Sequence, residues 1–225
     1  MNQHTNLTKK PYQAIFFDLD GTLTDPKKGI TGSIQFALEK MGLSAPPGDM
    51  LVWCIGEPLK EIFAKLLNTS CEALLIAALS FYREHFTNKG MYENFLYPDV
   101  PLMLENLIQE NYRLFIATSK PEIFAVKILK HFGLAHYFEK IYGSELDGTR
   151  SDKSHLVKYI MENNSINNPS VMVGDRKFDV IAALDNELIP LGVTYGYGSI
   201  KELNDAGAFH LCHSPKEVYK WIIKT

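Results

Sequence analysis

Residues 14–22 read AIFFDLDGT, and this stretch decides how the rest of the chain is interpreted. The apolar run Ala14–Phe17 is too short for a helix and ends in an acidic, glycine-containing segment, which is typical of a buried strand followed by a tight loop. Residues 114–117 (LFIA) and 171–173 (VMV) are similar apolar runs that also end in polar residues. We therefore expect three buried strands with polar side chains where each strand stops.

Between these strands, apolar residues recur at the spacing of an amphipathic helix. They are Leu102, Leu104, Leu107 and Ile108, then Phe124, Ile128, Leu129 and Phe132, then Leu156, Val157 and Ile160. Strands separated by helices pair in parallel through right-handed crossovers, with helices on both faces. The sequence therefore predicts an α/β fold, a Rossmann-like doubly wound parallel sheet, with a fourth strand near residues 190–194. Ligands of such sheets bind at the carboxyl ends of the strands, so the polar strand ends should meet at one rim.

From about residue 27 to residue 97, the pattern changes to one helix after another, and no strand is expected among these helices. We predict that residues 27–96 form an inserted α-helical cap domain over the rim. Residues 1–26 and 97–225 would form the catalytic core. If the cap closes over the site, its hinge should lie near residues 24–28 and 97–101.

Composition excludes several classes of protein. The net charge of −3 over 225 residues lacks the basic excess of proteins that bind nucleic acid polymers. No apolar run approaches the ~20 residues that cross a bilayer, so no membrane contact is expected and a cytoplasmic location is predicted. The cysteines Cys54, Cys71 and Cys212 are odd in number and form no CxxC pair, which argues against a disulfide framework. The chain could be a monomer or a homodimer.

Asp18 and Asp20 end the first predicted strand as an Asp-x-Asp pair. Acidic residues favour turns, so such a pair is weak evidence by itself. Here it follows a fully apolar strand, and two adjacent carboxylates repel each other unless a cation neutralises them. Mg²⁺ suits this place, because it binds one or two carboxylates together with a substrate phosphate.

Residues 16–25, FFDLDGTLTD, resemble the first signature of the haloacid dehalogenase superfamily, in particular its phosphoglycolate phosphatase-like branch. The resemblance implies that Asp18 is the nucleophile and a magnesium ligand. It also implies that Asp20 is the acid/base and a further ligand through its backbone carbonyl. The loop residues Gly21 and Thr22 would contact the substrate phosphate.

Thr118 follows the second strand and resembles the second signature, whose hydroxyl holds the phosphoryl group. Its neighbours Ser119 and Lys120 are then expected to bind substrate. Thr118 could also be a helix N-cap, because it precedes Pro121 and a helical pattern. Both interpretations are compatible, since a helix N-terminus attracts anions.

Lys153 is the candidate for the third signature, a lysine that stabilises charge on the nucleophile and the phosphate. The sequence departs here from the Lys-Pro pattern of many relatives, and Arg150 is a rival. Residues 174–179, GDRKFD, resemble the fourth signature, Gly-Asp-x-x-x-Asp. The resemblance makes Asp175 a magnesium ligand. Asp179 would bind a metal water or orient the lysine, although it could also be an acid at a helix start.

Substrate specificity should lie in the cap. Gly56 precedes Pro58 in a segment that resembles a cap loop of relatives, and it is a candidate substrate contact beside the alternative of an ordinary helix–helix turn. Arg83 could bind an anionic group, but beside Glu84 it could equally be solvated. Residues 195–198, YGYG, resemble a glycine-rich loop that supports the rim.

Together these residues predict a Mg²⁺-dependent phosphatase that hydrolyses a small phosphorylated metabolite through a phospho-aspartate. Phosphoglycolate is the first candidate substrate, followed by nucleoside 5'-monophosphates. A β-phosphoglucomutase-type phosphomutase would share all four signatures. A 2-haloacid dehalogenase would lack the second carboxylate, so Asp20 argues against it. A non-catalytic binding module is the remaining alternative, since a fold does not by itself determine a function.

Overall fold

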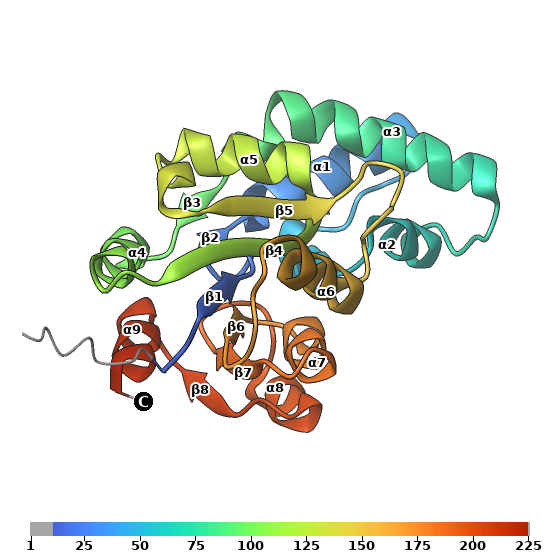
Figure 1. Ribbon diagram of the computed structural model, residues 1–225. Helices are drawn as coiled ribbons and strands as arrows, with labels where there is room; N and C mark the ends of the chain where they lie inside the picture. Colours follow the sequence, from blue (N-terminus) through green and yellow to red (C-terminus); the bar gives the residue numbers. More distant parts are fainter. Residues whose placement is uncertain (1–10, 225) are drawn as a thin grey trace, which may run out of the picture.

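The computed structural model describes residues 11–224, and its central feature is a six-stranded parallel sheet (Figure 1). The strand order is β5-β4-β1-β6-β7-β8. The strands are β1 (Ala14–Phe17), β4 (Arg113–Pro121), β5 (Lys140–Ser144), β6 (Val171–Gly174), β7 (Ile189–Val193) and β8 (His210–Cys212). The predicted α/β fold is confirmed, and the first strand along the chain lies in the middle of the sheet.

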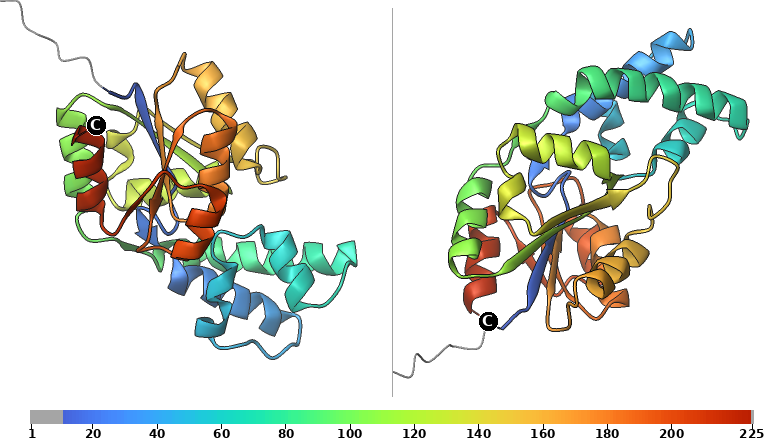
Figure 2. Two further views of the ribbon diagram at one scale, coloured as in Figure 1. Left: turned by 90° about the horizontal axis from the view of Figure 1, so that it is seen from below. Right: turned by 45° about the horizontal axis from the view of Figure 1, so that its top comes forward.

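Helices cover both faces of the sheet (Figure 2). They are α4 (Val100–Gln109), α5 (Glu122–His131), α6 (Lys153–Asn163), α7 (Lys177–Asp185), α8 (Ile200–Ala206) and α9 (Pro215–Lys224). Successive side chains of β1 point to opposite faces: Phe16 packs in one buried cluster with residues of α6 and α7, and Phe17 in another with residues of α4, α5 and α9. Because side chains on both faces of β1 are buried, its sequence is a continuous apolar run.

Residues 27–96, the predicted cap, lie beyond the end of the sheet (Figure 2). Its helices are α1 (Lys27–Lys40), α2 (Leu59–Leu66) and α3 (Glu72–Asn88), with 3-10 turns η1 (Gly48–Cys54) and η2 (Gly90–Tyr92). Ile34, Phe63 and Tyr82 fill the space between these helices. The division of the chain at residues 26 and 96 stays a prediction, and residues 1–10 of the predicted core lie outside the described residues.

Two short strands at the base of the cap were not expected. β2 (Thr24–Asp25) pairs antiparallel with β3 (Phe95–Leu96). Because β3 lies within residues 27–97, the prediction that no strand occurs among those helices is wrong, whereas β2 precedes them. A strand of two residues is too short to leave a periodic pattern in the sequence. Both connections between cap and core run through this pair.

The second expected strand is longer than the apolar run that predicted it. β4 continues through Thr118 to Pro121, and its pairing with β5 shifts register between Ala117 and Pro121. Because α5 begins at Glu122, its N-cap is Pro121. The alternative that Thr118 caps this helix is therefore wrong. Among residues 11–224, no helix has the length and apolar character that a membrane span requires.

Candidate active site

The ends of the central strands bring four charged side chains together at one rim of the sheet. Asp18 follows β1, Asp175 follows β6, Lys153 begins α6 and Asp179 lies in the first turn of α7. All four are buried. Thr118 is buried on β4, the strand that pairs with β1.

Lys153 is the cation of this cluster. Its Nζ lies 3.0 Å from Asp18 Oδ1 and 2.5 Å from Asp179 Oδ1. Burial alone lowers the pKa of a lysine, but the two carboxylates outweigh it and raise the pKa of Lys153 above its usual value. Lys153 therefore stays charged. Arg150, its rival in the sequence, is paired instead with Glu145 at 2.7 Å.

Asp18, Asp175 and Asp179 each offer a carboxylate oxygen within 4.8 Å of the others. Burial, reinforced by the two neighbouring carboxylates, raises the pKa of Asp175 to about 8. Within residues 11–224, Asp18 Oδ1 accepts no hydrogen bond, although Lys153 Nζ lies 3.0 Å away. Three crowded, buried carboxylates, one of them with an oxygen that accepts no hydrogen bond, fit a hard divalent cation such as Mg²⁺.

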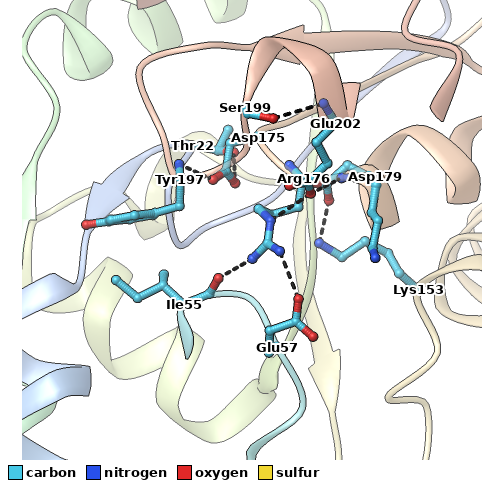
Figure 3. A network of polar contacts seen from close by, with 11 residues as sticks. Thr22, Ile55, Glu57, Lys153, Asp175, Arg176, Asp179, Tyr197, Ser199 and Glu202 are labelled. Atoms are coloured by element: carbon cyan, nitrogen blue, oxygen red, sulfur yellow. Dashed lines mark hydrogen bonds and ion pairs between the residues drawn. The ribbon is translucent and has the colours of Figure 1, made fainter. Parts of the chain in front are cut away.

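The carboxylates of Asp179 and Asp175 have different partners (Figure 3). Asp179 accepts hydrogen bonds on both oxygens, from Lys153 Nζ and from the backbone N–H of Arg176 at 2.9 Å. Both oxygens are thus occupied by cationic or N–H donors, which favours the interpretation that Asp179 orients the lysine. Asp175 accepts from neutral donors, the Thr22 hydroxyl at 3.4 Å and the Tyr197 N–H at 2.8 Å, whereas Asp179 is ion-paired with Lys153, so Asp175 is the stronger candidate for a metal ligand.

Two glycines allow the backbone to approach Asp175. A Cβ on Gly21 would lie 2.2 Å from Asp175 Oδ2, and a Cβ on Gly196 would lie 2.5 Å from the same atom. Gly21 also has a φ of +83°, which disfavours any side chain. Thr22, its neighbour, is fully buried, and its carbonyl accepts the Tyr195 hydroxyl at 3.1 Å. The predicted rim residues thus enclose one carboxylate.

Asp20 and Lys120 form a second charged pair at the rim. Lys120 Nζ lies 2.5 Å from Asp20 Oδ2, and the two side chains are 8% and 12% exposed. Burial raises the pKa of Asp20, and Lys120 opposes that rise. Lys120 Nζ also lies 4.9 Å from the ring centre of Phe86 on the cap helix α3. Ser119 is exposed, and its carbonyl accepts the Ser144 hydroxyl at 2.9 Å.

The two substrate candidates of the cap, Gly56 and Arg83, contact the core. Gly56 lies against the side chain of Arg176, and Arg83 Nη2 donates to the carbonyl of Leu146 at 2.6 Å. Sequence reasoning gave no role to Arg176, because it occupies a variable position of Gly-Asp-x-x-x-Asp. Its cap partners, Ile55 and Glu57, lie 121 and 119 residues away in the chain, and no local pattern signals such a contact.

Comparisons with known proteins agree with this geometry. The family model described as haloacid dehalogenase-like hydrolase matches residues 15–189. A 5'-nucleotidase of Pseudomonas aeruginosa is 42% identical over 202 residues, which are 89% of this chain and 91% of that protein. The tyrosine-protein kinase PtkA of Mycobacterium tuberculosis is 36% identical over 83% of this chain, which spans 63% of the kinase.

More distant relatives and solved structures extend the similarity. A phosphoglycolate phosphatase of Colwellia psychrerythraea is 29% identical over 87% of this chain and 90% of its own length. A crystal structure of a predicted phosphatase from Clostridium acetobutylicum superposes with a TM-score of 0.90 at 42% identity. It covers 95% of this chain, and the match includes 99% of that structure. Core and cap are therefore both included in the similarity.

Proposed function

The chain belongs to the haloacid dehalogenase-like hydrolases and is a phosphoric monoester hydrolase, and from this premise we propose that it uses Mg²⁺ and a phospho-aspartate on Asp18. The observation that supports the proposal is the buried cluster of Asp18, Lys153, Asp175 and Asp179. Such a cluster is costly to bury and has a direct use at a site that must bind a phosphate dianion.

The cation would be held by carboxylate oxygens of Asp18 and Asp175 and by the backbone carbonyl of Asp20. When bound, it supplies positive charge to the phosphoryl oxygens and relieves the repulsion among the carboxylates. Lys153 is charged and touches Asp18, so it adds a second positive charge at the point of attack. The Thr118 hydroxyl would hold the phosphoryl group.

The reaction has two steps. A carboxylate oxygen of Asp18 attacks phosphorus, and the bond between phosphorus and the ester oxygen breaks. Asp20 donates its proton to the leaving oxygen, and the raised pKa of Asp20 favours the protonated form that this step needs. Asp20 then takes a proton from water, whose oxygen attacks phosphorus. This second attack releases inorganic phosphate and restores the Asp18 carboxylate.

We propose nucleoside 5'-monophosphates as the first substrate class, ahead of phosphoglycolate. The sequence motifs placed phosphoglycolate first. The relative named 5'-nucleotidase is 42% identical, whereas the relative named phosphoglycolate phosphatase is 29% identical. This difference supports the reversed order. Both substrates are small phosphate monoesters, so the chemistry is the same.

The test is phosphate release from nucleoside 5'-monophosphates, phosphoglycolate, sugar phosphates and p-nitrophenyl phosphate, with Mg²⁺ or EDTA. Nucleoside 3'-monophosphates serve as matched control substrates. We expect Mg²⁺-dependent release that Asp18→Asn lowers by about 10⁴-fold or more, because the nucleophile is lost. Activity that survives this substitution would refute the phospho-aspartate. A higher kcat/KM for phosphoglycolate than for nucleoside 5'-monophosphates would make phosphoglycolate the first substrate candidate again. Phosphoryl transfer between sugar positions without release of inorganic phosphate would indicate a phosphomutase.

A further inference from the structure

The side chain of Arg176 joins the core to the cap (Figure 3). Its Nε donates to Glu202 Oε1 of the core at 2.9 Å. Its Nη2 donates to Glu57 Oε1 of the cap at 2.8 Å, and its Nη1 donates to the carbonyl of Ile55. The guanidinium group thus uses its planar fork to hold two carboxylates and a carbonyl at once.

Contacts within the core orient the Arg176 side chain independently of the cap. Glu202 Oε1 also accepts the backbone N–H of Lys177 at 3.0 Å, and the N–H of Glu202 donates to the Ser199 hydroxyl at 3.0 Å. Glu202 is therefore held by its own helix α8 and by the start of α7. Because these contacts do not involve the cap, the guanidinium remains aimed at the cap when the cap moves away.

On the cap side, the loop of residues 55–58 fits closely around the guanidinium. Gly56 has a φ of +87°, and a Cβ there would lie 2.8 Å from Arg176 Nη1 and 3.2 Å from its Cγ. A side chain at this position would therefore strain the backbone and displace the arginine. Only 11% of the Arg176 side chain and 16% of the Glu57 side chain are exposed, so water screens this ion pair poorly.

The backbone of Arg176 belongs to the catalytic cluster. The residue directly follows Asp175, and its N–H donates to Asp179 Oδ2, whose other oxygen holds Lys153. The Arg176 backbone therefore positions Asp179, the partner of Lys153. Its side chain holds the cap loop.

We propose that Arg176 is a positioning residue that clasps the cap loop, residues 55–58, in its closed place beside the metal-binding carboxylates. The kinetic consequence of this clasp rests on the proposed function, but the clasp itself does not. Small misplacements of groups that enclose a substrate cost up to about 10²-fold in rate, so a loosened loop should slow catalysis.

The first arm of the test measures backbone hydrogen exchange without substrate. The N–H groups of Ile55 and Glu57 donate to the carbonyls of Val52 and Cys54, so the closed loop should protect them. We expect Glu57→Gln and Arg176→Met to raise exchange at the Ile55 and Glu57 N–H groups by tenfold or more, and the double variant to raise it no further. Glu72→Gln is the matched control, because Glu72 pairs with Lys60 inside the cap at 2.8 Å.

The second arm measures kcat and KM with the best substrate of the panel. We expect kcat/KM to fall by about 10-fold in Glu57→Gln and up to about 10²-fold in Arg176→Met, with non-additive effects in the double variant. Arg176→Lys should not restore activity, because one ammonium group cannot reproduce the planar fork. A thermal melt confirms that each variant is folded.

Exchange in Glu57→Gln that equals that of Glu72→Gln would overturn the clasp. Additive kinetic effects of the two substitutions would also overturn it. If the wild type releases no phosphate from any substrate, the proposed function is refuted. The hydrogen-exchange measurement still tests whether Arg176 holds the cap loop, because it needs no substrate.

Discussion

Lys153 compensates two buried carboxylates, and we therefore expect both the stability of the fold and the proposed catalysis to depend on it. Its partners, Asp18 and Asp179, lie 3.0 and 2.5 Å from its Nζ. Breaking a buried ion pair costs more than the pair contributes, because it leaves an uncompensated charge in a poorly solvated place.

We predict that Lys153→Met lowers the free energy of unfolding by about 3–5 kcal/mol at pH 8. The loss should be smaller at pH 5. Burial already raises the pKa of Asp179 to about 6, and loss of the lysine raises it further, so Asp179 takes up a proton as the pH falls and the penalty declines. Denaturant unfolding at both pH values measures this. Lys158→Met, an exposed lysine on the same helix, should have little effect, and an equal loss in both variants would contradict the prediction.

At the scale of elements, the sequence predicted the parts whose signal is local. β1, β4 and β6 are apolar runs that end in polar residues, and each was expected. β5 and β8 were not, because both are edge strands with exposed first residues and lack a continuous apolar run. The motif spacing also predicted that Asp18 and the polar residues after the other strands meet at one rim of the sheet, and they do.

The sequence did not predict the side-chain partners of Lys120 and Arg176. The substrate contact expected for Lys120 stays a prediction, and its ion pair with Asp20, 100 positions earlier in the chain, was not foreseen. Arg176 reaches Glu57 across 119 positions. Such contacts depend on how distant elements pack, and no periodicity or motif carries that information.

The loop between β1 and β2 depends on the absence of a side chain at Gly21. We predict that Gly21→Ala destabilises the protein strongly and abolishes activity, because its Cβ would overlap the Asp175 carboxylate. Gly133→Ala is the matched control: its φ is also positive, at +69°, but nothing lies within 4 Å of the added Cβ. The control should lose only about 1 kcal/mol from backbone strain, with activity kept. Thermal unfolding and phosphate release separate the two effects, and equal losses would contradict the overlap.

Over the molecule as a whole, we expect the carboxylate cluster to link metal binding to stability. Asp18 lies far from Asp175 and Asp179 in the sequence, so the three carboxylates meet only in the folded state. A ligand that binds only the folded state raises the melting temperature by mass action.

We predict that Mg²⁺ raises the melting temperature of the wild type and that Asp175→Asn abolishes this rise. In EDTA, at a pH above the Asp175 pKa of about 8, the variant should be at least as stable as the wild type, because it removes one of three buried like charges. Calorimetry with and without Mg²⁺ measures both effects and needs no substrate. Glu61→Gln, on the cap, is the control and should keep the metal response. An unchanged response in Asp175→Asn would place the metal elsewhere.

The pairing of β2 with β3 at the base of the cap has a mechanical consequence. Thr24 faces Leu96 and Asp25 faces Phe95, so the two strands that enter and leave the cap form one short ribbon. A ribbon of two hydrogen-bonded strands resists sliding, because a slip of one residue would exchange its faces. It can still bend across its width. The cap is therefore expected to rotate about a single hinge axis at this ribbon. After each opening it should return to the same position on the core.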